Sequence, residues 1–490
     1  MRNKVLKEAP LVKLAVSLMA GVIVGDRVSL SDFQPLWLVL VGMVGLALLL
    51  WRSALWQSVA IGLSFVVLGV LLTAWQEHDL RVTWPEGEVC YEAVVLSEPV
   101  EKPKTMAVDV IIAANGWKLK CYLSKDDRSR ALRIGDGLRI QSHIRELSDW
   151  HVGTLDYRRY LEVHGFSGTT FVAAHHWQKA RFPLVQMSRI ERTKLFFLKL
   201  RSRLLARLKS HDAASQDAYA VVAAMVLGDK SALSRDLKDV YSVTGASHVL
   251  ALSGLHLSII YMLLSLLNVG RRWQSVSQLL MVLGIWAFVF LVGLPVSVVR
   301  SAMMLTAYGL LSLGHRDKMS VNTLAFVAII LLAVSPLSLF DVGFQLSFMA
   351  VLSIVTVLPL LDGLWSEKYL QEHRIVHWAW STAAVSCAAQ MGVAPLIAYY
   401  FGRFSCYFLL TNFIVVPMTT LILYLSLVVL LFPGLVYLLL YIAGSLNWIL
   451  SVIADWPRAS INGLHPTLLQ VVMTYVVITA VWLLWVRVRR

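Results

Sequence analysis

The sequence predicts a polytopic α-helical membrane protein with roughly ten spans and a small extracytoplasmic β-barrel domain inserted after the third span. Of its 490 residues, 58% are hydrophobic and 15% are charged, and the mean hydropathy is +0.67. Soluble domains carry about a quarter charged residues and have shorter apolar runs. One long segment has no such runs and alternates in hydrophobicity, which is typical of strands.

Twelve apolar stretches approach the ~20 residues that are needed to cross a hydrocarbon core. Several are short or interrupted by proline, so we expect roughly ten crossings. The candidates are Leu14–Gly25, Leu36–Trp51, Leu55–Trp75, Val249–Leu267, Val276–Leu294, Val296–Leu313, Val321–Val334, Val342–Leu361, Trp378–Phe401, Tyr407–Phe432, Leu435–Ile453 and Leu468–Trp485.

The first span follows "MRNKVLKEAPLVK", which is similar to the basic start of a signal peptide. No small-residue cleavage site follows and a second span comes soon after, so we interpret this stretch as a retained anchor. Basic residues favour the cytoplasmic side of a membrane. The basic N-terminus, Arg52 and the terminal "RVRR" therefore predict cytoplasmic ends, which places the segment after Trp75 outside.

The formal charge of +14 and the isoelectric point near 9.6 have two explanations. Basic cytoplasmic loops and attraction to anionic lipid explain much of the excess. A polyanionic substrate such as nucleic acid is the alternative. Charge alone favours the first.

Residues 77–183 form the β-rich segment. In "MAVDVIIAANGWKLKCYL", Asn115-Gly116 predicts a two-residue hairpin turn between two β-rich flanks. "GDGLRIQSHI" repeats the pattern of a turn followed by alternation, and "CYEAVVL" is an earlier strand. A small antiparallel barrel is the natural closure for about a hundred such residues.

Cys90 and Cys121 both lie at strand positions of this segment. Given an outside location, a disulfide between them is reasonable and worth ~3–4 kcal/mol on loop-entropy grounds. Two unrelated buried thiols are the alternative. Cys387 and Cys406 lie in apolar spans, where buried thiols are expected.

Residues 184–245 are polar and helical. "RTKLFFLKLRSRLLARLKS" alternates basic and apolar residues at helical spacing, which predicts an interfacial helix on anionic lipid. A nucleic-acid groove is the alternative for this stretch.

Polar and ionisable groups inside membrane spans are costly, so each is a functional hypothesis. Each also has a structural explanation, such as a hydrogen bond to a neighbouring helix. These residues are His248, Ser253, His256, Arg300, Asp341, Gln345, Gln390 and Asn412.

The stretch "HVLALSGLHLSIIY" raises several interpretations. Spacing of four puts His248, Leu252 and His256 on one stripe of a continuous helix, but Gly254 could break that helix and open the backbone toward a cavity. A metal site would need further ligands, and none has the required spacing. Ser253 at "ALSGLH" could be the nucleophile of an intramembrane hydrolase, although a base one turn away rarely aligns with its hydroxyl.

Arg300 follows Pro295 by about one turn in "VGLPVSVVRSAMM". A guanidinium binds phosphate or carboxylate as a bidentate fork. Two interpretations of Arg300 therefore stay open: a phosphate contact from the lining of a pore, and a buried pair with Asp341. Gln345 lies in the same interrupted stretch as Asp341, and Asn412 lies near Pro417 in another. Repeated breaks in several spans favour a lined cavity.

These motifs resemble those of the ComEC-type competence membrane channel family. "TGASHVLALSGLHLSII" resembles its long T-G-x-x-H-L-L-A-I-S-G-L-H-V signature, and "GDKSALSRDLKDVYSVTG" resembles the lead-in to that signature. "LPVSVVRSAMM", "SPLSLFDVGFQLSFMAVLSI" and "TNFIVVPM" are similar to three further elements of the family, and "GTLDYRRYLEVHGFSGT" resembles the end of its extracytoplasmic domain. The resemblance runs from about Leu11 to Trp485.

The resemblance implies an inner-membrane channel that passes single-stranded DNA into the cytoplasm during natural transformation. It implies an anchor region over residues 1–76, an OB-like domain with a disulfide over 77–183, interfacial helices over 184–245 and a channel over 246–490. OB-like barrels bind single strands through aromatic and basic residues, so Trp117, Lys118 and Lys120 are candidate DNA contacts. The implied DNA path contains His248, Ser253, Gly254, His256, Arg300, Asp341, Gln345 and Asn412.

Many members of the family carry a C-terminal metallo-β-lactamase-like domain, whereas this chain ends in "VWLLWVRVRR" after a span. No metal motif of that kind and no phosphate-binding G-x-x-x-x-G-K-(S/T) loop occurs. We therefore expect no catalytic residues, metal or cofactor in this chain. Expected partners are single-stranded DNA, the lipid bilayer, a DNA receptor, an ATPase or helicase, and a separate nuclease.

The expected location is the bacterial inner membrane, with both termini cytoplasmic. Two other functions stay open: an intramembrane serine hydrolase that uses Ser253, and a transporter of another polyanion.

Overall fold

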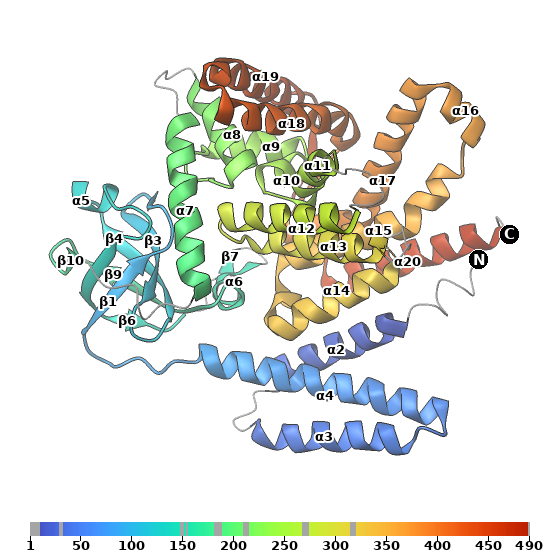
Figure 1. Ribbon diagram of the computed structural model, residues 1–490, viewed down its shortest axis with the longest axis horizontal. Coiled ribbons are helices and arrows are strands. Elements are labelled where there is room, and N and C mark those ends of the chain that lie inside the picture. Colours follow the sequence, from blue (N-terminus) through green and yellow to red (C-terminus); the bar gives the residue numbers. More distant parts are fainter. Residues whose placement is uncertain are drawn as a thin grey trace. The chain divides into compact units, whose positions relative to one another are not determined.

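The computed structural model describes residues 10–28, 33–147, 151–152, 155–180, 189–208, 215–266, 274–313 and 320–488 (Figure 1). The basic residues 1–9 and the last two arginines, on which the orientation prediction partly rests, lie outside this part. The chain divides into two compact units. Unit 1 comprises residues 1–189 and 319–345, and unit 2 comprises residues 190–318 and 346–490.

The helical part of unit 1 contains α2 (Pro10–Arg27), α3 (Gln34–Leu49), α4 (Ala54–Leu80), α14 (Val321–Val334) and the 3-10 helix η4 (Pro336–Phe340). Helices α2 and α4 pack backbone against backbone, because "GVIVG" places small residues one turn apart. A β-carbon added at Gly69 would lie 2.5 Å from the carbonyl oxygen of Leu18, and one at Gly21 would overlap Val66. Only glycine permits this approach.

Helix α14 and η4 join this unit although 240 residues of chain separate α14 from α4. The side chain of Asn322 accepts a hydrogen bond from the amide of Leu11 at 3.0 Å, at the start of α2. Gln76 of α4 accepts one from the amide of Leu337 at 3.1 Å. Residues 319–345 therefore belong with the first helices, while the predicted boundaries at 76, 183 and 245 stay predictions.

The β domain of unit 1 has one sheet in the order β10-β5-β1-β3-β4-β9-β6, and β2 pairs with β3. A separate pair joins β7 (His151–Val152) to β8 (Leu155–Asp156), and the short helices are α5 (Asp127–Arg130) and α6 (Tyr157–Val163). The strands of the main sheet are β1 (Val89–Val95), β2 (Val100–Glu101), β3 (Thr105–Ile112), β4 (Lys118–Ser124), β5 (Gly137–Ser142), β6 (Ile144–Arg145), β9 (Phe166–Val172) and β10 (Trp177–Ala180).

This sheet curls round on itself. Strands β5 and β6 are separated only by His143, yet β5 pairs with β1 and β10 while β6 pairs with β9 at the other end. The hydroxyl of Thr170 donates to the carbonyl of His143 at 3.1 Å and fixes the bend. The turn predicted at Asn115-Gly116 joins β3 to β4, with Gly116 at φ 76°.

The interior of the β domain follows the predicted alternation. In β4, Leu119, Cys121 and Leu123 are fully buried, and the residues between them face outward. The structure does not support the Cys90–Cys121 disulfide, because both thiols are free and Cys90 is exposed. Strand β3 also lies between β1 and β4, so the two cysteines sit on non-adjacent strands and on opposite faces of the sheet.

Unit 2 is helical, with the 3-10 helix η5 (Pro433–Leu435) and one small strand pair, β11 (Arg403–Ser405) and β12 (Ser460–Asn462). Its helices are α7 (Arg189–Leu208), α8 (Gln216–Leu227), α9 (Arg235–Val243), α10 (Ser247–Leu250), α11 (Gly254–Ser265), α12 (Gln274–Leu291), α13 (Val296–Leu313), α15 (Val342–Asp362, which begins in unit 1), α16 (Glu367–Glu372), α17 (Arg374–Phe401), α18 (Phe408–Leu431), α19 (Val436–Ala454) and α20 (Leu468–Val488).

Helix α8 lies within a hydrophobic core of unit 2. Every residue from Ala220 to Leu227 is buried, which is typical of a helix that is surrounded by other helices. It packs against α18 and α19 (Figure 1). Its sequence "AVVAAMVL" suits this position because small side chains let neighbouring helices approach closely.

Seven helices of the described residues are long and apolar enough to cross a membrane: Ala54–Leu80, Gln274–Leu291, Val342–Asp362, Arg374–Phe401, Phe408–Leu431, Pro433–Ala454 and Leu468–Val488. Five shorter apolar helices include α11, which has 12 residues. A helix of that length measures about 18 Å, against ~30 Å of hydrocarbon. The chain is therefore a multi-pass membrane protein, and the predicted count of ten spans is not confirmed.

Candidate functional site

The candidate site is the broken helix pair, which we define as α10, α11 and the residues Ala251–Ser253 between them. Helix α10 ends at Leu250, and the next residues are extended, with Ala251 at φ −94° and ψ 121° and Ser253 at φ −126° and ψ 176°. Helix α11 then begins at Gly254. The stripe predicted for one continuous helix is therefore wrong, and the predicted alternative of a break is correct, although the break precedes Gly254.

Helix α13 satisfies the opened backbone. The hydroxyl of Ser297 donates to the carbonyl of Leu252 at 2.9 Å. A β-carbon added at Gly254 would lie 3.0 Å from the Ser301 hydroxyl. Irregular backbone among apolar helices persists only where protein or water supplies partners, and here a serine of a neighbouring helix supplies one.

Ser253 and His256 form a local contact at the start of α11. The Nδ1 atom of His256 lies 3.1 Å from the hydroxyl of Ser253 and accepts the backbone N–H of Ser253 at 3.3 Å. This arrangement is a helix cap in which the third residue reaches back to the N-cap. His256 is fully buried, and its Nε2 atom has no hydrogen-bond partner among the described residues.

His248 lies on the other side of the break and differs from His256. It is exposed, and its Nδ1 donates to the carbonyl of Gly245 at 3.0 Å. That bond leaves its Nε2 as the free acceptor of the neutral ring. Of the two predicted histidines, one is thus buried and one exposed. His248 is fixed by the Gly245 carbonyl before α10, and His256 is fixed by Ser253, the last residue of the break.

Arg300 of α13 is the largest fully buried side chain of the described residues, with 2% of its surface exposed. Its Nε donates to the hydroxyl of Ser347 on α15 at 3.3 Å. A guanidinium in such a position requires several acceptors, because an uncompensated buried charge is costly. The residue predicted to meet phosphate is therefore enclosed by protein in this conformation.

Asp341 and Gln345 lie in unit 1 and fix the turn from η4 into α15. A carboxylate oxygen of Asp341 accepts the amide of Phe344 at 3.0 Å, which caps α15. The Gln345 side chain donates to the carbonyl of Leu339 at 3.1 Å. These bonds explain both residues as local structure.

Asn412 of α18 donates to the hydroxyl of Ser386 on α17 at 3.1 Å. An amide that bonds across two membrane helices is the structural role expected for this residue type. Asn412 therefore joins α17 to α18.

The DNA contacts predicted in the β domain are largely occupied. Trp117 is packed edge-on against Trp84, with ring centroids 5.3 Å apart. Lys120 forms an ion pair with Asp109 at 2.5 Å, so its charge is neutralised. Lys118 is half-buried on the outer face of β4.

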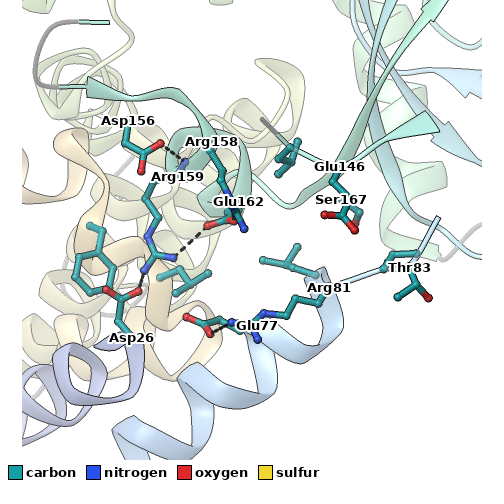
Figure 2. A pocket seen from close by; sticks show the side chains of 15 residues that line it. Asp26, Glu77, Arg81, Thr83, Glu146, Asp156, Arg158, Arg159, Glu162 and Ser167 are labelled. Carbon is teal, nitrogen blue, oxygen red and sulfur yellow. Dashed lines mark hydrogen bonds and ion pairs between the residues drawn. The ribbon is translucent and has the colours of Figure 1, made fainter. Parts of the chain in front are cut away.

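A second polar feature is a cleft of about 740 Å³ within unit 1 (Figure 2). Five carboxylates and three guanidiniums line it, so it does not favour a polyanion. Those residues are Asp26, Glu77, Arg81, Glu146, Asp156, Arg158, Arg159 and Glu162.

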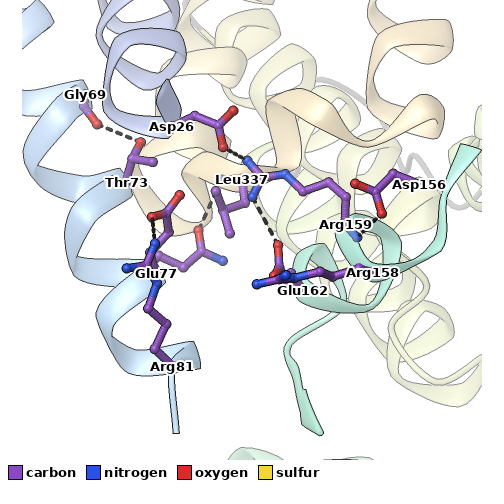
Figure 3. Close-up of polar contacts among 11 residues, drawn as sticks. Asp26, Gly69, Thr73, Glu77, Arg81, Asp156, Arg158, Arg159, Glu162 and Leu337 are labelled. Atoms are coloured by element: carbon purple, nitrogen blue, oxygen red, sulfur yellow. Dashed lines mark hydrogen bonds and ion pairs between the residues drawn. The ribbon is translucent and has the colours of Figure 1, made fainter. Parts of the chain in front are cut away.

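Arg159 of α6 lines this cleft and is the centre of a network of polar contacts beside it (Figure 3). Its guanidinium pairs with Asp26 of α2 and, at 3.2 Å, with Glu162 of its own helix. It also lies over the ring of Phe340 in η4, 4.6 Å from the ring centroid. One planar cation therefore joins the β domain to α2 and η4, and two carboxylates and an aromatic face suit such a cation.

Sequence reasoning missed the supporting residues. No pattern in the sequence identifies Ser297 as a partner of the break, although Ser297 and Ser301 share one helical face beside Arg300. No local sequence pattern identifies Arg159 as a site residue, because its partner Asp26 lies 133 residues away. Among the described residues, no group of three or more His, Cys, Asp or Glu could hold a metal ion.

Long apolar helices, a folded β domain and a helix broken at polar residues define a multi-pass membrane protein with polar groups held between its helices. A family model described as "Competence protein" matches residues 225–488, which is more than half of the chain. The chain belongs to this competence protein family, which confirms the resemblance to the ComEC type.

Two relatives support the assignment. ComE operon protein 3 of Bacillus subtilis (strain 168) is 27% identical over 272 residues, which is 55% of this chain and 32% of that protein. An uncharacterized protein of Aquifex aeolicus (strain VF5) is 29% identical over 231 residues, or 47% of this chain and 49% of that one. The matches thus span a third to a half of these relatives. No solved structure matches the chain.

Proposed function

We propose that this protein is a channel that passes single-stranded DNA across the cell membrane into the cytoplasm during natural transformation. Membership of the competence protein family supports a role in DNA uptake. The observation that carries the channel role is the broken helix pair, because an opened backbone within apolar helices provides polar groups where a polar strand has to pass. Helix α11 is also too short to span the bilayer alone.

In this proposal the structure corresponds to a closed state. Arg300 is enclosed and bonded to Ser347, and opening would exchange that hydroxyl for a DNA phosphate, which binds a guanidinium more strongly. The unpartnered Nε2 of His256 would gain a polar partner in the same step. His248, Ser253 and Gly254 would shape the path at the break. Asn412 would join α17 to α18, and Asp341 and Gln345 would fix the turn from η4 into α15.

The proposal places the protein in the bacterial inner membrane with both termini in the cytoplasm. The β domain, proposed to be OB-like, would then lie outside and receive the strand. Energy and strand processing would come from partners: a DNA receptor, an ATPase or helicase, and a nuclease.

Substitution of the buried cation tests the proposal. Arg300→Ala and His256→Ala should each reduce uptake of labelled DNA at least tenfold in a deletion strain that expresses the variant under competence-inducing conditions. Ser445→Ala, at a half-buried serine that bonds to the Tyr441 carbonyl of its own helix α19, is the matched control and should retain uptake. Near-normal uptake by both test variants at normal membrane levels would refute their role in the pore, and uptake by the deletion strain itself would refute the channel.

The Ser253–His256 contact of 3.1 Å favours a second candidate, an intramembrane serine hydrolase. A hydroxyl hydrogen-bonded to an imidazole is the pairing that activates a nucleophile. Ser253→Ala would abolish a hydrolase, whereas a channel should tolerate this small residue in part. Labelling of Ser253 by a fluorophosphonate probe in purified protein would support the hydrolase.

A further inference from the structure

The apolar stripe of α7 is buried against other helices of the protein. Leu195, Leu198, Leu205 and Leu208 are buried, and the last two belong to the core around α8. A β-carbon added at Gly293, just after α12, would lie 2.9 Å from Leu198. An interfacial helix has to insert its apolar face into the bilayer, and this face is already covered by α8 and the end of α12.

Arg201 locks α7 in this position. Its guanidinium donates to the carbonyl of Val292 at 3.2 Å and to that of Leu227 at 3.5 Å. Those carbonyls stand at the C-terminal ends of α12 and α8, where the helix dipoles favour a cation. Gly228 follows Leu227, and a β-carbon there would lie 2.7 Å from Leu252 of the broken helix pair. Helix α7 is therefore fixed beside the proposed DNA path.

The opposite face of α7 is exposed and basic. Lys199, Arg203 and Arg207 follow one another at intervals of four residues and are all exposed, so their positions repeat about every 6 Å along one side of the helix. None of the ion pairs between described residues involves them. Phe196 lies one turn before Lys199 and has 65% of its surface exposed.

We infer that this face, which we call the cationic ladder (Phe196, Lys199, Arg203 and Arg207), binds the phosphates of single-stranded DNA and that Phe196 stacks on a base. The inference rests on the proposed function, because it names the surface that guides the strand to the broken helix pair. A row of cations that form no ion pair with another described residue, beside an exposed aromatic residue, is the combination that binds single strands without sequence preference. Lipid is disfavoured because the leucine stripe that would insert is buried.

Binding of a fluorescent 20-residue oligo-dT to the full chain tests the inference. The protein is placed in nanodiscs of phosphatidylcholine, so no anionic lipid competes. Lys199→Gln/Arg203→Gln/Arg207→Gln should weaken binding at least tenfold and lower the slope of log affinity against log salt by about 2, since each phosphate contact on a single strand contributes about 0.7. Phe196→Ala should weaken binding at least fivefold, as expected for loss of one stacked base.

The matched control is Lys13→Gln/Lys368→Gln/Arg374→Gln, which removes the same charge from other exposed positions and should leave binding within twofold. Binding of oligo-dT by the ladder variant at wild-type strength would overturn the inference. The inference would also be overturned if the ladder variant differed from the wild type only in the amount of phosphatidylglycerol that stays bound on purification. The occupant of the ladder would then be lipid. The deletion strain tests the channel separately: if uptake requires the chain but the ladder variant binds normally, only the ladder inference fails.

Discussion

Ser297 shows how a single hydroxyl can hold an irregular backbone among apolar helices. Leu252 lies in the break, and its carbonyl accepts the Ser297 hydroxyl instead of a helical N–H. A buried carbonyl without a donor costs about 1–3 kcal/mol. The serine in "LPVSVVR" therefore has a structural reason that is independent of DNA.

Ser297→Ala should lower the free energy of unfolding by about 1–3 kcal/mol, because the Leu252 carbonyl loses its donor. Ser451→Ala is the matched control, since the hydroxyl of the half-buried Ser451 bonds to the Trp448 carbonyl within its own helix turn. The midpoint of thermal unfolding in detergent measures both. Equal midpoints for the two variants would show that the break needs no support from α13.

Cys121 and Cys90 differ in environment, and their chemistry should differ accordingly. Burial raises the pKa of the Cys121 thiol from 9.0 to about 12, so the neutral thiol is favoured in the folded β domain. The contribution of Cys121 to the free energy of unfolding should be constant below pH ~9 and fall by up to about 1.4 kcal/mol per pH unit above it. At pH 8 a maleimide should label Cys90 quickly and Cys121 only after unfolding. If neither thiol reacted with the maleimide until a reductant was added, the predicted Cys90–Cys121 disulfide would be supported instead.

Among the elements, the amphipathic pattern of α7 was visible in the sequence, but its partner was not. Periodicity identifies which residues share a face and cannot say whether lipid, DNA or another helix covers it. The same limit applies to the broken helix pair. The spacing of His248 and His256 fits a continuous helix, and the break depends on Ser297, 45 residues beyond Leu252.

Strand alternation in β4 was predicted correctly because it depends on local sequence alone.

The packing of α2 against α4 provides a test at the scale of elements. Gly69→Ala should destabilise the protein although alanine favours helix by about 1 kcal/mol, since the new carbon would lie 2.5 Å from a backbone oxygen. Gly42→Ala on α3, where a β-carbon meets nothing within 4 Å, should be neutral or stabilising. A lower unfolding temperature for Gly42→Ala than for Gly69→Ala would contradict the packing.

For the whole molecule, hydropathy predicted a multi-pass protein correctly, because it follows from composition. The count of spans was not confirmed, since helices such as α11 are apolar but short. Of the candidate site, the break in the helix was predicted, and the roles of its histidines and of Arg300 stay predictions. The supporting partners come from other parts of the chain. Contacts such as Asp26–Arg159 depend on the tertiary fold, which no local pattern encodes.

The predicted orientation has a direct test through Cys90, which is exposed on the β domain. In a variant with Cys387→Ala and Cys406→Ala, a membrane-impermeant maleimide should label Cys90 in intact spheroplasts as fully as in lysed ones. A cysteine introduced at the C-terminus should be labelled only after lysis. Labelling of Cys90 only after lysis would reverse the topology.

The membership of α14 and η4 in unit 1 sets an order of events during biosynthesis. Helix α2 is made early, yet Asn322, whose side chain accepts a hydrogen bond from the amide of Leu11, follows that residue by 311 positions. At about 5–20 residues per second, the ribosome needs roughly 15 to 60 seconds to supply it. During that interval α2 and α4 lack the partners that α14 and η4 later supply. A chaperone or the insertion machinery itself therefore has that time to act on the first helices.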